Sequence, residues 1–163
     1  IRQSNLIEGV DDAVDDKLCF RAWKDFSAQS YLNLVNILDL HRAISHKKLG
    51  MNAGKFRTVN VTVGGRVCPS WQSVPKLIEG WIVEYRQPKT EEAIKKAHVE
   101  FEKIHPFVDF NGRVGRMILQ FHRQGIGLDP LLIMADNRQE YYSWFDDLGF
   151  DRVPQFAHGF GWR

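Results

Sequence analysis

The sequence predicts a mainly α-helical domain that carries one short β-hairpin. Apolar residues recur at helical spacing in several windows, which is the pattern of helices with one buried face. One window, Thr58–Val63, alternates β-branched residues instead, and Gly64-Gly65 follows it and turns the chain. With 163 residues, the chain is long enough to bury a sizeable core, and we expect a single domain over residues 1–163.

Composition narrows the classes of partner. Hydrophobic residues make up 44% and charged residues 26%, which is ordinary for a globular protein. The net charge of +2 is too small to indicate a nucleic-acid or membrane partner, and no apolar run approaches the roughly 20 residues of a membrane span. Cys19 and Cys68 lack a CxxC spacing, so we expect neither a disulfide framework nor a zinc site.

The start of the chain gives little information about location. It begins at Ile1 rather than Met and shows no secretory signal, which is compatible with an excerpt of a longer protein. We therefore expect a cytoplasmic location by default, with any upstream targeting sequence out of view.

The first predicted helix spans residues 29–45 and follows an acidic stretch at residues 1–16. The helix prediction depends on apolar residues spaced three or four apart, namely Tyr31, Leu34, Val35, Leu38, Ala43 and Ile44. Next comes a glycine-punctuated stretch from Gly50 to Gly65, in which residues 58–63 read as one arm of a hairpin. Pro69 ends this region.

Two further helices are predicted between residues 74 and 105. The first carries the stripe Val74, Leu77, Ile78, Trp81, Ile82 and Tyr85. The second begins after Thr90, because Glu91 and Glu92 place negative charge at the positive end of the helix dipole. Pro106 fits poorly into a helix interior, so this helix is expected to stop near His105.

The last predicted helices follow a loop. One begins near Gly112, buries Met117, Ile118 and Phe121, and is closed by Gly125 and Gly127. Asp136 is expected to cap another helix, which bears Tyr141, Tyr142 and Phe145. The tail from Gly149 to Arg163 is aromatic and contains glycine, and its pattern predicts no element.

Residues 105–116, His-Pro-Phe-Val-Asp-Phe-Asn-Gly-Arg-Val-Gly-Arg, concentrate the chemistry of the chain. His105 has the residue type whose ordinary pKa lies near neutrality, which suits a general base. Asp109 offers one carboxylate, and one carboxylate can hold Mg²⁺ when phosphates and waters complete its shell. Each residue alone is more often a surface, turn or capping residue, and it is their joint occurrence that indicates a site.

The end of the same segment predicts a phosphate cradle. Asn111 and Gly112 fall where a helix should begin, so free backbone N–H groups and the dipole favour an anion there. Gly112 allows a phosphate to approach the backbone closely. Arg113 and Arg116 project from the first helical turn, and each guanidinium can donate two parallel hydrogen bonds to phosphate.

This segment resembles the signature of the Fic family, His-x-Phe-x-Asp/Glu-Gly-Asn-Gly/Lys-Arg-x-x-Arg. The chain departs from it at Phe110, where the family usually has Gly or Ala. If the backbone there has a positive φ, a Phe would be strained. Residues 54–63 also resemble the entry to the family's β-hairpin flap, residues 74 onward resemble the helix after it, and residues 137–142 resemble the downstream segment that closes over the nucleotide base. The resemblance covers about residues 4–142.

The resemblance implies a Fic-type helical bundle and transfer of AMP from ATP to a Ser, Thr or Tyr hydroxyl of a target protein. It implies His105 as the base, Asp109 as the Mg²⁺ ligand, and phosphate contacts from Asn111, Gly112, Arg113 and Arg116. A flap at about residues 56–68 would pair with the target through Val59, Asn60, Val61, Thr62 and Val63. Tyr141 or Tyr142 would pack on the adenine, although aromatic residues on a helix are more often core.

A second motif lies near the start, where Ser4-Asn5-Leu6-Ile7-Glu8-Gly9 resembles the family's inhibitory signature Ser/Thr-x-x-x-Glu-Gly/Asn. The resemblance implies that Glu8 pairs with Arg116 within the same chain. A carboxylate there would remove the clamp on the γ-phosphate and repel the phosphate. A plain helix end, with Gly9 as its cap and Glu8 in solvent, is the alternative.

Three alternative functions stay open from sequence. The same site could remove AMP, could transfer another nucleotide or a phosphoryl group, or could be a non-catalytic nucleotide-binding module, which Phe110 favours most. The sequence also leaves a homodimer open. A P-loop is excluded, because Gly50–Lys55 has one residue too few between its glycines and Phe56 follows where Ser or Thr is needed.

Overall fold

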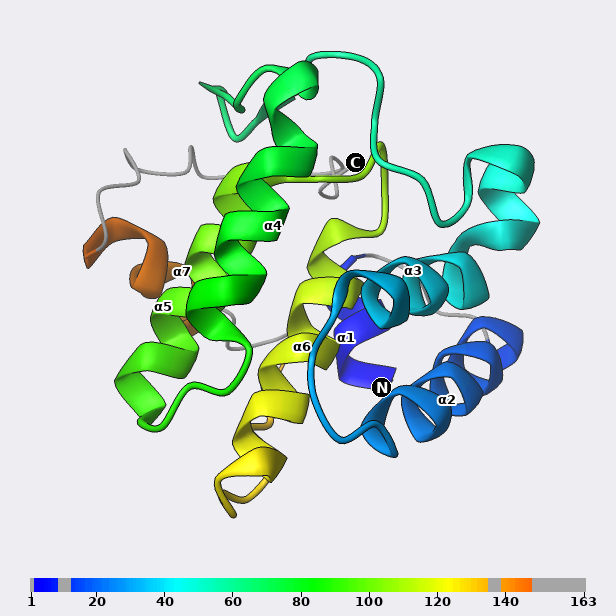
Figure 1. Cartoon of the computed structure of the whole chain (residues 1–163). Coiled ribbons are helices and arrows are strands. Elements are labelled where there is room, and N and C mark those ends of the chain that lie inside the picture. The colour runs from blue at the N-terminus through cyan, green and yellow to red at the C-terminus, as the bar shows by residue number, and fades with distance from the viewer. Residues whose placement is uncertain (1, 9–12, 135–138, 148–163) are drawn as a thin grey trace.

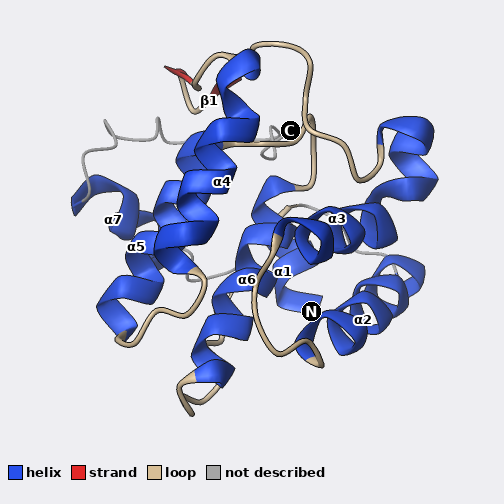
Figure 2. Ribbon diagram, in the orientation of Figure 1, coloured by secondary structure: helices blue, strands red, loops and turns tan. Residues whose placement is uncertain are grey.

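The computed structural model describes residues 2–8, 13–134 and 139–147, and within them the chain is a helical bundle with one small hairpin (Figures 1 and 2). The helices are α1 (Arg2–Ile7), α2 (Ala13–Ser27), α3 (Leu34–Leu49), α4 (Val74–Tyr85), α5 (Glu91–Ile104), α6 (Asn111–Gly125) and α7 (Gln139–Asp147). Two short 3₁₀ turns, η1 (Gly50–Asn52) and η2 (Trp71–Ser73), and the strands β1 (Thr62–Val63) and β2 (Arg66–Val67) lie between α3 and α4. The predicted mainly α fold is confirmed.

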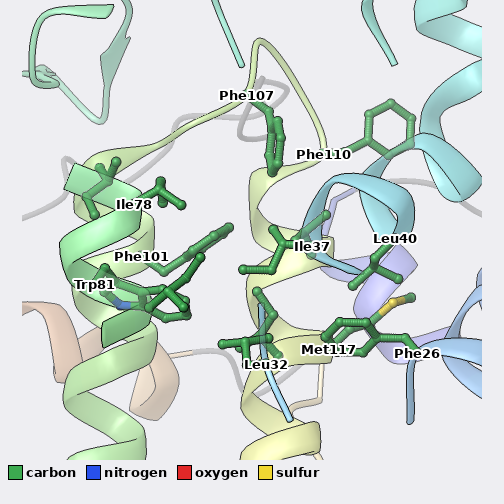
Figure 3. Close-up of a cluster of buried hydrophobic side chains, with 14 of the residues drawn as sticks. Phe26, Leu32, Ile37, Leu40, Ile78, Trp81, Phe101, Phe107, Phe110 and Met117 are labelled. Carbon is green, nitrogen blue, oxygen red and sulfur yellow. The ribbon is translucent and has the colours of Figure 1, made fainter. Parts of the chain in front are cut away.

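Helix α6 is the centre of the bundle. It packs against α5 on one side and against α1, α2 and α3 on the other, while α4 and α7 contact α5 (Figure 1). The buried side chains between α2, α3, α4, α5 and α6 form one hydrophobic cluster, which includes Phe26, Ile37, Ile78, Phe101 and Met117 (Figure 3), and a smaller cluster lies between α5 and α7. Residues 111–119 of α6 are all buried, so packing holds the N-terminal part of this helix in place.

The boundaries of α3 correct the sequence prediction of a helix over residues 29–45. The helix begins at Leu34 because Asn33 caps it: the Asn33 side chain accepts the Asn36 backbone N–H, and the Asn36 side chain accepts that of Asn33. Tyr31 and Val35 are exposed, at 47% and 67%, so they are not part of the buried stripe. The buried residues are Ile37, Leu40, His41, Ile44 and Ser45.

Helix α2 is absent from the prediction, because its charged residues dilute the helical pattern. It nevertheless buries Cys19, Ala22 and Phe26. Helix α4 buries the predicted stripe except Leu77, which is 38% exposed. Helix α5 begins as predicted, and the Thr90 hydroxyl accepts the Ala93 N–H at 3.1 Å as its N-cap. No helix among the described residues is long and apolar enough to cross a membrane.

The hairpin is shorter than expected. Strands β1 and β2 pair antiparallel, with Thr62 opposite Val67 and Val63 opposite Arg66. Gly64 and Gly65 have φ values of 57° and 81°, as a two-residue type I′ turn requires. The predicted arm over residues 58–63 is strand only at its end, because Arg57 Nη1 donates to the Val59 carbonyl oxygen at 2.8 Å and bends the chain.

Candidate functional site

His105 lies at the end of α5 and turns the chain out of the helix. Its N–H donates to the Phe101 carbonyl oxygen at 3.0 Å, and its φ of 49° is left-handed. This backbone conformation ends α5 just before Pro106, as the sequence predicted. The side chain is only 1% exposed. A reacting hydroxyl could therefore reach the imidazole only after a neighbouring element has moved.

Arg57 fixes the end of α5 from the base of the hairpin. Its guanidinium donates to the carbonyl oxygens of His105 at 2.8 Å, Pro69 at 2.6 Å and Ile104 at 3.3 Å, in addition to that of Val59. A buried cation at a helix C-terminus donates to carbonyl groups that have no partner in the helix, and it interacts favourably with the negative end of the helix dipole. Arg57 thus fixes the position of His105 relative to the hairpin.

Asn111 organises the loop between α5 and α6. Its side-chain oxygen accepts the Phe107 N–H at 2.9 Å, and its side-chain nitrogen donates to the Phe107 carbonyl oxygen at 2.9 Å. Both ends of the amide are thereby used inside the loop. The phosphate contact that the resemblance implies for Asn111 is therefore left to its backbone N–H, which lies at the start of α6.

Gly112, Arg113 and Arg116 lie together on the first turns of α6. All three are buried, with Arg113 at 4% and Arg116 at 5% exposure. A Cβ at position 112 would clash with Glu8 Oε1 and would approach Arg116 Nη1 to 2.9 Å. Only a glycine leaves room for an anion beside the helix start at this point.

Phe110, the departure from the family signature, caps α6 in a left-handed conformation with a φ of 68°. This conformation strains a residue with a side chain. The ring is buried, with the Arg113 guanidinium 3.7 Å from its centroid and the Lys48 ammonium at 5.7 Å. Burial and two cation–π contacts offset the strain, so the loop keeps a glycine-like backbone while it bears a Phe.

Asp109 presents its carboxylate at the mouth of the loop. Oδ1 accepts the Phe110 N–H at 2.7 Å, and Oδ2 pairs with Lys48 Nζ at 2.8 Å. The described residues contain no cluster of three or more His, Cys, Asp or Glu side chains that could hold a metal ion. This donor set fits Mg²⁺ bound by one carboxylate together with substrate phosphates and waters, and the Lys48 ammonium shows that Oδ2 accepts a cation.

His41 supports the loop from α3 and was not singled out as a site residue from sequence. Its ring stacks on Phe107, with centroids 3.8 Å apart and planes 4° apart. Nδ1 accepts the Gly54 N–H at 2.9 Å, so Nε2 carries the proton and donates to the Asp109 carbonyl oxygen at 3.2 Å. Burial lowers the pKa of His41 to about 4. A lone histidine on a helix gives no sequence signal for this role.

Helix α1 brings the second predicted motif to Arg116. Glu8 Oε1 pairs with Arg116 Nη2 at 2.5 Å, and both side chains are 6% exposed. Ser4 adds two contacts, because its hydroxyl accepts from Nε at 2.9 Å and its carbonyl oxygen from Nη2 at 3.1 Å. Burial alone would lower the pKa of Arg116, but the adjacent Glu8 carboxylate reverses the shift and raises it. Gly9, the last residue of the motif, lies outside the described residues.

The predicted adenine contacts differ in burial. Tyr141 is 5% exposed, and its hydroxyl bonds to His98 Nε2 at 2.8 Å. His98 Nδ1 bonds to the Gly115 carbonyl oxygen at 3.1 Å, so this chain of contacts joins α7, α5 and α6. Tyr142 is partly buried and packs beside Tyr141. Tyr141 therefore also has a packing role, and adenine contact by either residue stays a prediction.

Glu102 is a buried carboxyl group that the sequence did not single out. It is 3% exposed, and its Oε1 has no hydrogen-bond partner within the described part of the chain. A Cβ at position 115 would clash with this oxygen, so Gly115 permits the close approach of α5 and α6. Burial raises the pKa of Glu102 to about 8. Glu102 is therefore mostly protonated at neutral pH.

The predicted target-binding segment lies along the hairpin. Val59, Asn60 and Thr62 are exposed, Val61 is half-buried and Val63 is buried. Within this segment, the Val61 carbonyl oxygen accepts the Cys68 N–H at 3.1 Å, and the Asn60 side-chain Oδ1 accepts the Trp71 N–H at 3.1 Å. Strand pairing of this segment with a target stays a prediction.

A cavity of about 630 Å³ lies between α1, α2, α6 and residues 128–133, and Arg116 is part of its lining. Its lining includes Ser4 and Trp23, but it includes none of His105, Asp109 and Arg113. The cavity therefore does not enclose the site in this conformation. The Glu8 carboxylate lies beside Gly112 and Arg116, where the sequence predicted a phosphate.

A family model and curated relatives agree on the family of this chain. The model of the Fic/DOC family matches residues 31–122. The chain is 32% identical over 119 residues to the protein adenylyltransferase Fic of Drosophila mojavensis, an alignment that covers 69% of this chain and 23% of that protein. It is 28% identical over 149 residues to the protein adenylyltransferase fic-1 of Caenorhabditis briggsae, which covers 88% and 29%. The chain thus spans about a quarter of the length of these curated relatives.

Solved structures agree on the fold. A fragment of Fic-1 from C. elegans superposes with a TM-score of 0.68 at 20% identity, covering 87% of this chain and 47% of that one. A Fic domain containing signaling protein from Bacteroides thetaiotaomicron superposes with a TM-score of 0.64 at 19% identity, covering 86% and 62%. At these identities, both matches show the fold alone.

Proposed function

Because this chain belongs to the Fic/DOC family, we propose that it is a protein adenylyltransferase, which transfers AMP from ATP to a Ser, Thr or Tyr hydroxyl of a target protein. The observation that carries the proposal is the arrangement at the start of α6. Two buried arginines and the free N–H groups of a helix lie next to a glycine. They lie on the loop that joins α6 to His105.

In this proposal the cradle binds the triphosphate of ATP. The N–H groups of residues 111–113 point along the helix axis toward the phosphates, and Arg113 adds a guanidinium from the same turn. Arg116 holds the γ-phosphate and so aligns the α-phosphorus for attack. The carboxylate of Glu8, which now contacts Arg116, supports this assignment because it shows that the position accepts an anion.

His105 then acts as general base. The target hydroxyl oxygen attacks the α-phosphorus and forms a new P–O bond, while the bond from the α-phosphorus to the bridging oxygen breaks and pyrophosphate leaves. The hydroxyl proton passes to the imidazole of His105. Arg57 and Asn111 hold the loop that carries His105, and such positioning supplies much of the rate enhancement in transfers of this kind.

Asp109 would hold the magnesium ion that accompanies ATP. When bound, the metal would supply positive charge against the phosphates. Asp109 is suited to this role because its Oδ1 is fixed by the Phe110 N–H and its Oδ2 faces a cation. The partners implied by the proposal are thus ATP, Mg²⁺ and a hydroxyl-bearing target protein.

We also propose that the protein inhibits itself through Glu8. While Glu8 and Ser4 occupy the Arg116 guanidinium, the γ-phosphate lacks its main partner and meets a carboxylate instead. ATP could then bind only with a misaligned α-phosphorus. Release of α1 is the step that would activate the enzyme, and it would also uncover part of the buried site.

The test is incubation with labelled ATP and Mg²⁺, followed by mass spectrometry of any labelled protein. The expected product carries one AMP adduct, its yield rises in Glu8→Gly, and it disappears in Glu8→Gly combined with His105→Ala. The doubly substituted protein should still bind ATP, because His105 contributes chemistry rather than affinity. Binding of ATP without any transfer by Glu8→Gly would instead support a non-catalytic nucleotide-binding module.

Removal of AMP is the second candidate function, and the position of Glu8 favours it. A buried carboxylate beside Arg116 could orient a water molecule toward the phosphorus atom of the AMP group on a modified side chain. Incubation with an AMP-modified target separates the two candidates. Loss of the adduct that requires Glu8 supports removal, whereas a gain of adduct in Glu8→Gly supports transfer.

A further inference from the structure

Lys48, in the last turn of α3, is brought to the candidate metal ligand by the fold. It lies 61 residues before Asp109 in the chain, yet its Nζ is 2.8 Å from Asp109 Oδ2. Its side chain is 65% exposed, whereas that of Asp109 is 14% exposed. One partner of this ion pair is thus held by the fold, and the other is free to leave into solvent.

The carboxylate of Asp109 has a fixed orientation. Oδ1 accepts the Phe110 N–H at 2.7 Å, and the Asp109 carbonyl oxygen accepts from His41 Nε2 at 3.2 Å. These contacts hold the residue from both sides. Oδ2 is then the oxygen directed toward a cation, and the cation found there is the ammonium of Lys48.

From this geometry we infer that Lys48 is the resting counter-ion of Asp109 and competes with the divalent metal for Oδ2, an inference that rests on the proposed function. A magnesium ion bound directly to Oδ2 would lie about 2 Å from it. An ammonium at hydrogen-bond distance from the same oxygen would then meet a divalent charge within a few ångströms. The ammonium must move away before the metal binds.

Lysine suits this exchange. Its charge lies at the end of a flexible four-carbon stem, and the mostly exposed side chain can reorient without disturbing the core. The Phe110 ring, whose centroid is 5.7 Å from Nζ, adds a weak second contact that keeps the ammonium near the site. Lys48 would therefore keep Asp109 neutralised in the absence of metal and nucleotide, and it would raise the metal concentration needed to load the site.

The size of the effect follows from the exposure of Lys48. An ion pair with one exposed partner contributes little to stability, so its loss should strengthen metal binding by only about fivefold. The competition should also weaken with rising ionic strength, because salt screens the ion pair.

The experiment measures metal binding without nucleotide or activity. Mn²⁺ is titrated into ¹⁵N-labelled protein. Its paramagnetism broadens nearby signals, and the recorded value is the Mn²⁺ concentration at which the backbone amide signals of residues 109–113 have lost half of their intensity. Lys48→Met should lower this concentration about fivefold relative to wild type. Lys47→Met is the matched control, since it removes the same charge from the exposed neighbouring residue of α3, and it should leave the concentration nearly unchanged.

Asp109→Asn separates failure of this inference from failure of the metal assignment. If broadening is lost in Asp109→Asn but Lys48→Met behaves like Lys47→Met, Asp109 binds metal and the competition by Lys48 is refuted. If Asp109→Asn broadens like wild type, the metal site is not at Asp109, and both the assignment and the inference fail. Dispersed amide spectra of each variant show that it has folded.

Discussion

Replacing Glu8 with Gly tests the contact on which the proposed regulation depends. The change removes the carboxylate from Arg116 and leaves the guanidinium with Ser4 alone on α1. We expect AMP incorporation to rise by at least tenfold, because α1 then spends more time away from the site and Arg116 becomes available to the γ-phosphate.

The structure gives the scale of this change. Helix α1 has six residues, too few to be stable alone, so its docking depends on its contacts. Ile7, which is 4% exposed, contributes roughly 1.5–3 kcal/mol at most. The charge-assisted bond of Glu8 contributes about 2 kcal/mol, and its loss would shift the docking equilibrium about 30-fold.

The assay is the initial rate of labelled AMP incorporation into a generic acceptor or into the protein itself. Glu8→Gln keeps a hydrogen-bonding side chain without the charge and should fall between wild type and Glu8→Gly. Glu79→Gln, an exposed carboxylate on α4, should behave like wild type. Amide hydrogen exchange of residues 2–8 reports separately whether α1 has been released.

One result would refute the reasoning. The amide hydrogens of α1 could exchange much faster in Glu8→Gly while the rate of AMP incorporation stays within twofold of wild type. In that case the contact with Arg116 does not limit activity. If neither protein transfers AMP to any acceptor, the transferase proposal itself is in doubt, whatever the state of α1.

Three further predictions concern stability, and chemical denaturation measures each. Phe110→Gly should be more stable than Phe110→Ala by about 1 kcal/mol, because both lose the ring but only Gly relieves the positive φ of 68°; a more stable Ala variant would contradict the strain. Arg57→Lys should lower the free energy of unfolding by about 2–4 kcal/mol, because the buried guanidinium that donates to four carbonyl oxygens is lost. The same change at the exposed Arg42 should lower it by under about 0.5 kcal/mol. Glu102→Gln should stabilise the protein by about 3 kcal/mol more at pH 8 than at pH 5, and an equal effect at both pH values would rule out the buried carboxyl as the cause.

The sign of the Glu102 prediction follows from its pKa, which burial raises from 4.5 to about 8. In the folded protein the group stays protonated up to that pH, while in the unfolded chain it ionises above 4.5. The contribution of Glu102 to the stability of the wild type is therefore most favourable below pH 4.5. It becomes less favourable as the pH rises from 4.5 through 8. Glutamine cannot ionise, so it removes this loss.

Local features of the fold were readable from neighbouring residues. Thr90 before two glutamates predicted the start of α5, Pro106 predicted its end, and Gly64-Gly65 predicted the hairpin turn. Each depends on backbone dihedral limits or a cap within a few residues. Residues 105–116 also predicted the family, which the comparisons confirmed, because the motif is contiguous and its chemistry follows from residue type.

What the tertiary structure decided involves partners far apart in the chain. Ser4 and Glu8 reach Arg116 across 112 and 108 residues, and Lys48 reaches Asp109 across 61. Their distances depend on how α1, α3 and α6 pack, which no local pattern specifies. The same packing buries Glu102 and directs both ends of the Asn111 amide into the loop. The sequence alone therefore determined which groups are present and where α5 begins and ends, while packing decided which groups meet and which atoms remain available for chemistry.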